Sequence, residues 1–164
     1  MNAEHTPESR SGFLLRFGAL LVVSYLCVAS RLVDRAVVTP FTAGIADATA
    51  VILRCLGERV VVDETTIHSS GFGISVRNGC NGVEASMLLA AAVFAFPASW
   101  RHRVKGLLVG ALAIQIVNLV RVVSLFWIGK YDPSMFFYVH VVMWPSFIIL
   151  ATTMYFFHWI QQKA

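Results

Sequence analysis

The sequence predicts an all-α integral membrane bundle of four, or alternatively five, transmembrane helices with a small extracytoplasmic β-hairpin. Two features of its composition predict this fold class. Hydrophobic residues make up 57% of the 164 residues and charged residues 13%, and the mean hydropathy is +0.71. Soluble domains contain about 25% charged residues, so a soluble fold of this length could not cover so much apolar surface. The same composition excludes a disordered chain, a coiled coil and a disulfide-rich secreted domain.

The chain is expected to form one membrane-embedded domain over residues 13–164, after a cytoplasmic or frayed tail over residues 1–12. Apolar segments of about the length that crosses a bilayer, roughly 20 residues, cover residues 13–31, 80–100, 104–128 and 135–160. A cleaved signal peptide is the alternative for the first segment. We favour a retained span, because no clear cleavage site precedes a soluble domain.

The loop from Trp100 to Lys105 predicts the orientation of the helices. It holds three basic residues and no acidic residue, which is typical of a cytoplasmic loop. Cys80 and residues 129–134 then lie outside. The net charge of +4 comes from basic residues beside apolar runs, so it indicates membrane orientation and no nucleic-acid partner.

Residues 36–56 admit two interpretations. Apolar residues recur there at helical spacing, at Phe41, Ile45, Ala48, Ile52 and Leu56. This pattern favours an amphipathic helix on the outer surface, which gives four spans and a cytoplasmic N-terminus. If the segment spans the membrane instead, there are five spans, and Arg31 and Arg35 are cytoplasmic.

Residues 57–80 are expected to form the extracytoplasmic hairpin. Residues 60–62 are a β-branched run, residues 72–77 alternate in polarity, and His68–Gly71 supplies the turn. The second strand leads directly to Cys80.

Three residues within or beside the spans are functional candidates, because such side chains are costly in a bilayer: Cys80, Arg121 and His140. Cys80 lies at the outer boundary. Arg121 precedes Lys130 by nine residues, roughly 13 Å of helix, and His140 follows Pro133 by seven, roughly 10 Å. All three are therefore expected to meet in one cavity near the outer face.

These three residue types suit thiol catalysis. Cys80, at the start of its helix, is the candidate nucleophile. His140 is the candidate general base toward the thiol and general acid toward a leaving amine. Arg121 would hold the thiolate or a developing oxyanion. Asn118 shares a helical face with Arg121, and Glu84 shares one with Cys80, so Glu84 is a candidate for orienting His140 or pairing with Arg121.

Other functions stay open at this point. A non-enzymatic membrane scaffold could carry a structural Cys–Arg–His cluster. A transporter subunit is disfavoured because the polar residues gather near one face, with Gln115 alone deeper. Cys27 and Cys55 have no candidate polar partners and are expected to be small buried residues. With no Cys-x-x-Cys and no metal-ligand spacing, no redox site, metal or cofactor is predicted.

Three motifs resemble the signature regions of the exosortase/archaeosortase family: Asn78-Gly-Cys80-Asn81-Gly82, Asn118-Leu-Val-Arg121-Val122 and Phe137-Tyr-Val-His140. The resemblance covers roughly residues 40–160. It implies that Cys80 is the nucleophile, with Arg121 and His140 as its partners. Asn81, within the first motif, joins Asn118 and Glu84 as a supporting candidate.

The resemblance also implies a function. Members of this family process exported proteins that carry a C-terminal sorting signal: a short motif, one transmembrane helix and a basic cluster. The chain would then be a cysteine protease or transpeptidase of the bacterial inner membrane, with an extracytoplasmic site and an unidentified acceptor nucleophile. It is more compact than longer members. Its run from Cys80 to Ala85 is similar to the subgroup linked to signals beginning Ile-Pro-Thr-Leu.

Overall fold

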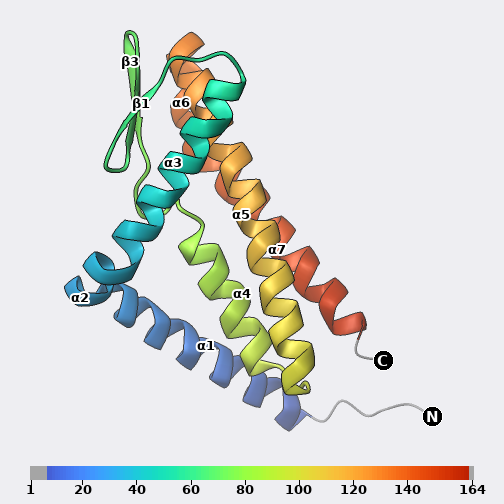
Figure 1. Cartoon of the computed structure of the whole chain (residues 1–164). Coiled ribbons are helices and arrows are strands. Elements are labelled where there is room, and N and C mark those ends of the chain that lie inside the picture. Colours follow the sequence, from blue (N-terminus) through green and yellow to red (C-terminus); the bar gives the residue numbers. More distant parts are fainter. Residues whose placement is uncertain (1–6, 163–164) are drawn as a thin grey trace.

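The computed structural model describes residues 7–162 and consists of helices and one small sheet (Figure 1). The elements in chain order are α1 (Pro7–Ala29), α2 (Arg31–Val33), the π-helix η1 (Asp34–Val38), α3 (Thr39–Cys55), β1 (Val61–Asp63), β2 (Thr66–Ser69), β3 (Phe72–Ser75), α4 (Val83–Ala95), α5 (Trp100–Tyr131), α6 (Pro133–Tyr138), the π-helix η2 (Val139–Met143) and α7 (Trp144–Gln161). This architecture confirms the predicted fold class. Residues 1–6 of the expected tail lie outside the described residues, and the chain is helical from Pro7.

Four helical stretches are long and apolar enough to cross a membrane, among the residues described: Ser11–Ala29, Arg31–Cys55, Trp100–Tyr131 and Pro133–Gln161. They are not the same four that the sequence favoured. The expected span over residues 80–100 shortens to α4, which is 13 residues and about 20 Å long. The chain enters α4 through the loop that carries Cys80, and this loop takes up the part of that segment before Val83.

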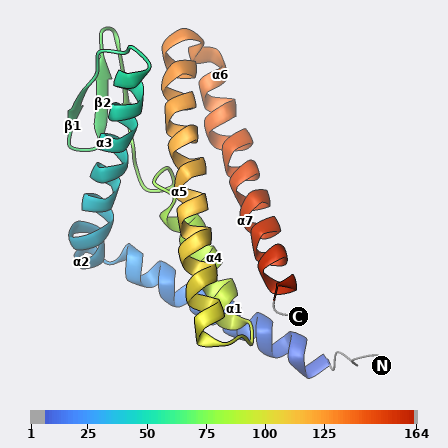
Figure 2. The same ribbon diagram turned by 45° about the vertical axis from the view of Figure 1, so that its right-hand side comes forward.

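The segment over residues 36–56 does not form a peripheral helix. It belongs to the continuous stretch Arg31–Cys55, and α3 runs beside α5 and ends next to the sheet (Figures 1 and 2). The residues it buries are small or β-branched for the most part: Thr42, Ile45, Ala46, Thr49, Ala50 and Leu53. Phe41 and Leu56, two residues of the apolar pattern, are exposed on the protein surface. In a membrane, small side chains pack between helices and large apolar side chains can face lipid, so the face that α3 packs against the bundle is rich in small residues.

Glycines allow α5 to pack closely against its neighbours. A Cβ at Gly106 would collide with the indole of Trp159, and one at Gly110 with Leu89 and Tyr155. The same buried face of α5 continues to Asn118 and Arg121. A close helix–helix contact of the small-residue type therefore places these two polar side chains inside the bundle.

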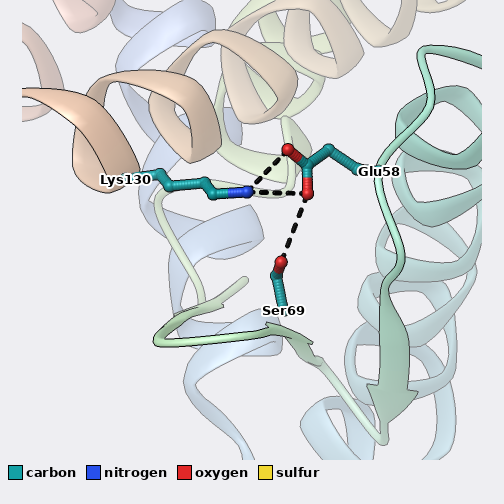
Figure 3. Close-up of polar contacts among 3 residues, drawn as sticks. All are labelled: Glu58, Ser69 and Lys130. Carbon is teal, nitrogen blue, oxygen red and sulfur yellow. Dashed lines mark hydrogen bonds and ion pairs between the residues drawn. The ribbon is translucent and has the colours of Figure 1, made fainter.

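The sheet has three antiparallel strands in the order β1-β2-β3, one more than the hairpin expected on the extracytoplasmic side. His68 and Ser69 lie in β2, so the turn expected at His68–Gly71 is confined to Ser70 and Gly71. Lys130 at the end of α5 contacts both carboxylate oxygens of Glu58, at 2.6 and 2.8 Å, and Ser69 donates to Glu58 at 3.2 Å (Figure 3). This ion pair ties the sheet to the bundle.

The ion pair should make attachment of the sheet sensitive to acid. The hydrogen bond and the charge of Lys130 hold the pKa of Glu58 below its ordinary value of 4.5. The stabilisation is therefore complete above the unfolded-state pKa and is lost as pH falls through the lower folded-state value. We expect limited proteolysis of residues 57–75 to accelerate with that fall in pH. Glu58→Gln should be cleaved faster even at neutral pH, whereas Glu64→Gln in the β1–β2 turn should match wild type. A wild-type rate for Glu58→Gln would contradict this role.

Candidate active site

Cys80 lies in the loop that connects β3 to α4, and two glycines shape this loop. Gly79 and Gly82 have φ values of 87° and 77°, in the left-handed region that side-chain-bearing residues rarely adopt. The amide of Cys80 donates to the Arg77 carbonyl at 2.8 Å, which closes the turn. The tight turn expected around the cysteine is therefore present, and it projects the half-buried thiol toward α5 and η2.

The structure brings together the three residues that the sequence singled out. The Sγ atom of Cys80 lies 3.7 Å from Nε2 of His140 and 3.6 Å from Nη2 of Arg121. Arg121 Nη1 also donates to the Gly79 carbonyl at 2.9 Å. The guanidinium thus holds both the backbone and the thiol of the turn, while the imidazole approaches the sulfur from a different helix.

A π-helical turn places His140. η2 ends two residues before Pro145, and η1 likewise ends two residues before Pro40. Proline has no N–H and its ring clashes with the carbonyl four residues earlier, so the widened turn accommodates it. The ring of His140 stacks on Phe136 at a centroid distance of 5.5 Å. Stacking and the widened turn together fix the direction of the imidazole.

Arg121 and Asn118 share the buried face of α5, as expected. Arg121 is 4% exposed, and its Nε atom has no hydrogen-bond partner among the described residues. Asn118 is fully buried, and neither of its side-chain amide atoms has a partner there. Buried polar groups are costly to leave unpaired, so both residues retain unused hydrogen-bonding capacity inside the bundle.

Glu84 and Asn81 support the turn rather than the reacting atoms. Glu84 was a candidate for orienting His140 or pairing with Arg121. It instead accepts the Gly79 amide at 2.8 Å, because the turn folds back over the first turn of α4. Asn81 is fully buried and accepts the Val83 amide at 3.0 Å, which satisfies a free donor at the start of α4.

Sequence reasoning missed two residues that hold this turn. Asn81 Nδ2 donates to Thr42 Oγ1 of α3 at 2.8 Å, and Asn78 Nδ2 donates to Asp34 Oδ1 of η1 at 3.1 Å. Asn78 and Asn81 flank the cysteine in the sequence, and it could be seen there that their amide side chains need hydrogen-bond partners. Thr42 was not recognised because residues 36–56 were interpreted as a surface helix, and Asp34 lies just before that segment.

The surroundings of Cys80 act in opposite directions on its acidity. Burial raises the pKa of the thiol above its ordinary value of 9.0, the charge of Arg121 lowers it, and the charge of Glu84 raises it. The net shift is upward, so the resting cysteine is a thiol that requires a base to become nucleophilic. The imidazole of His140 lies within reach of the sulfur and could accept its proton.

Alkylation of Cys80 should report these charges. In a Cys27→Ser/Cys55→Ser background, we expect the pH midpoint for reaction with iodoacetamide to lie above 9.0. Glu84→Gln should move the midpoint down, because a negative neighbour is removed. Arg121→Gln should move it up, because the favourable cation is lost. Rates measured from about pH 7 to 10 on purified protein test both signs, and equal midpoints for the two variants would refute the assignment.

Two cavities adjoin the turn. One, of about 380 Å³, contains the thiol and the imidazole, and it is lined by residues 73–78, Cys80, Val122, Leu125, Phe136 and His140. The other, of about 230 Å³, touches Gly79, Gly82, Glu84 and Arg121. Both cavities therefore border the turn that carries Cys80.

The remaining cysteines are not part of the site. Cys27 and Cys55 are exposed free thiols, so the expectation that they are buried was wrong. Both lie on outward faces of apolar helices, where a small side chain does not have to fill a packed interior. Within the described residues, no group of three or more His, Cys, Asp or Glu could hold a metal ion.

Comparison with protein families gives one match that covers nearly the whole chain. Residues 9–159 match the family described as Transmembrane exosortase (Exosortase_EpsH), and this range includes Cys80, Arg121 and His140. Comparisons with curated proteins and with solved structures gave no match. The assignment to a narrower subgroup stays a prediction. The chain is a membrane protein that belongs to the transmembrane exosortase family.

Proposed function

We propose that this protein is a cysteine transpeptidase or protease that cleaves C-terminal sorting signals of exported proteins, within the protein-sorting role that its family implies. One observation carries the proposal: a thiol on a glycine turn lies within 3.7 Å of an imidazole and 3.6 Å of a guanidinium. This is the arrangement of a nucleophile with a base and an anion-stabilising donor. The chemistry needs no cofactor or metal.

The mechanism follows from these positions. His140 takes the thiol proton, and the Cys80 sulfur attacks the carbonyl carbon of the scissile peptide. Arg121 stabilises the oxyanion with its unpaired Nε–H or its Nη2–H. As the C–N bond breaks, His140 gives the proton to the leaving amine and a thioester remains on Cys80. His140 then deprotonates an acceptor, either water or an amine or hydroxyl nucleophile, which attacks the thioester and restores the thiol.

The placement in the membrane fits such substrates. We place the loop Trp100–Lys105 in the cytoplasm of a bacterial inner membrane, so the sheet and Cys80 lie toward the extracytoplasmic side. A substrate with an external motif, one transmembrane helix and a cytoplasmic basic cluster would present its scissile peptide at the depth of Cys80. A signal beginning Ile-Pro-Thr-Leu is the first one to test.

A cleavage assay in membranes tests the proposal. A reporter with such a signal is co-expressed with wild type, Cys80→Ala, Arg121→Ala or His140→Ala, and with Cys27→Ala as the matched control for removal of a thiol. We expect wild type and Cys27→Ala to shorten the reporter and the three site variants to fail at equal expression. Cleavage by Cys80→Ala would overturn the nucleophile assignment. The product mass separates hydrolysis from transfer.

A further inference from the structure

The cavity of about 230 Å³ is distinct from the cavity that contains the thiol and the imidazole. Helices α1, α4 and α7 form most of its wall, through Leu21, Tyr25, Ala85, Leu88, Pro145, Ile148, Ile149 and Thr152. It reaches the active-site turn at Gly79 and Gly82. From the start of α4 at Val83 it extends down to Leu88, about 8 Å along the helix. It is therefore an apolar pocket within the membrane-spanning layer that opens beside the reacting atoms.

Two residues in the wall of this apolar pocket carry a buried polar atom that has no partner among the described residues. Thr152 is 5% exposed, and its hydroxyl has no partner among the described residues. Three other helical threonines bond to the carbonyl four residues earlier: Thr42 at 2.7 Å, Thr49 at 2.7 Å and Thr153 at 2.8 Å. The Thr152 hydroxyl makes no such bond. Arg121 also lies in this wall, and its Nε atom has no partner among the described residues either.

We propose that this cavity receives the first turn of the transmembrane helix of the sorting signal, the segment that follows the scissile peptide. The inference rests on the proposed function. A helix that enters the membrane from outside has its N-terminal end at this depth, and its first four N–H groups lack partners within the helix. Glu84, Thr152 and Tyr25 line the cavity and carry side-chain oxygens that can accept such hydrogen bonds. The Glu84 carboxylate also matches the positive end of the helix dipole.

The size of the cavity shows how the substrate turn would sit. One helical turn with its side chains is a cylinder about 10 Å across and 5.4 Å long, roughly 420 Å³. The cavity holds about half of this volume, so the turn would project between α1 and α7. Helix α1 can yield there, since none of residues 11–29 is buried. It packs mainly on α4, and Phe13 stacks on Phe156 of α7 at 6.4 Å.

A smaller apolar cavity of about 50 Å³ between α5 and α7 also borders Thr152, but no residue of the turn lines it. Two larger apolar grooves in the described part of the chain also fit this occupant less well. One, lined by α1, α3, α4 and α5, includes Leu112 and Gln115. The other, lined by α3 and α5, includes Ile116 and Trp127. Neither is lined by Gly79, Cys80, Arg121 or His140. A substrate helix in either groove would not enter beside the Cys80–Arg121 pair.

Thr152 gives the first test, with Thr153 as its matched control. We expect Thr152→Val to slow reporter cleavage about fivefold, the effect of one lost hydrogen bond, and Thr152→Ser to restore it. Thr153→Val, whose hydroxyl bonds only its own helix, should cleave at the wild-type rate. The rate of Cys80 alkylation by iodoacetamide should be the same in all three variants, because the thiol is untouched. Wild-type cleavage by Thr152→Val would overturn the role of its hydroxyl.

Cross-linking gives the second test. Single cysteines replace Leu88, Leu112 or Ile116 in a chain that lacks Cys27, Cys55 and Cys80, and the reporter carries one cysteine in the first turn of its helix. We expect oxidation to cross-link the reporter to Leu88→Cys and not to the other two. A cross-link at Leu112→Cys or Ile116→Cys alone, or none at all, would overturn this docking site.

Different results would refute the proposed peptidase function and the proposed helix site. The same reporter is first incubated with the Cys27→Ser/Cys55→Ser chain, which retains Cys80. If that chain leaves the reporter intact, the proposed peptidase function fails. If it cleaves the reporter but Leu88→Cys gives no cross-link, the peptidase stands and this cavity is not the helix site.

Discussion

Replacing Arg121 by lysine should reduce cleavage of the sorting-signal reporter at least about 100-fold, the usual effect of removing an oxyanion donor. The guanidinium donates to the Gly79 carbonyl at 2.9 Å and to the Cys80 sulfur at 3.6 Å through two different nitrogens. A third nitrogen, Nε, is unpaired among the described residues and is the donor available to an oxyanion. An ammonium cannot reproduce three directed donors from one planar group. Initial rates of cleavage in membranes measure the loss.

Alkylation of Cys80 separates the charge of Arg121 from its geometry. Arg121→Lys keeps the cation, so the pKa of the thiol should stay near its wild-type value while cleavage collapses. Arg121→Gln should lose cleavage and also raise that pKa, because Arg121 lowers it in the wild type. If Arg121→Lys cleaves at the wild-type rate, the arginine supplies only charge, and the oxyanion role assigned to it is wrong.

Depth along a helix was the part of the site that could be predicted from sequence. The rise of an α-helix is fixed, so distances from loop residues place Arg121 and His140 at similar depths. The structure brings both side chains to the sulfur of Cys80. The π-turn η2 was not foreseen, although Pro145 lies two residues beyond it. Its effect on the direction of His140 depends on a backbone adjustment that hydropathy does not record.

The face that α3 packs against the bundle could not be predicted from the apolar pattern alone. That pattern favoured a helix on the outer surface, whereas α3 packs in the bundle and buries Thr42, Ala46 and Thr49. Lipid solvates large apolar side chains as well as a protein core does, so the burial of small residues decides helix contacts. Cys27 and Cys55 were expected to be buried because free cysteine usually is, and both are exposed.

The short-range polar contacts of the turn could not be predicted from the sequence either. Glu84 lies four residues after Cys80, a spacing that suggested contact with His140 or Arg121. The left-handed glycines fold the chain back instead, and the carboxylate meets the Gly79 amide. A spacing rule for helices applies only from Val83 onward, where α4 begins. The partners of residues 76–82 therefore depend on the turn itself.

Replacing Asn81 by alanine should be the most damaging change outside the Cys–Arg–His set. The side chain is fully buried and makes three hydrogen bonds, to Thr42, Asn78 and the Val83 amide. Its loss leaves buried donors and acceptors unpaired, at a cost of about 1–3 kcal/mol of stability. It also frees the turn that positions the thiol, and a displacement of about 1 Å can lower a rate roughly 100-fold. Thermal unfolding and reporter cleavage measure the two effects.

Thr42 distinguishes a positioning role from a purely structural one. Its hydroxyl donates to the Val38 carbonyl at 2.7 Å and accepts from Asn81 at 2.8 Å, so it links α3 to the turn. Thr42→Val should slow both cleavage and Cys80 alkylation, and Thr42→Ser should restore both. Thr49→Val is the matched control, because that hydroxyl is equally buried and bonds only the Ile45 carbonyl. If Thr42→Val and Thr49→Val lose stability alike and neither changes the reactivity of the thiol, the link from α3 to the turn does not position Cys80. If only Thr42→Val changes that reactivity, the helix interpreted from sequence as peripheral is the one that sets the nucleophile in place.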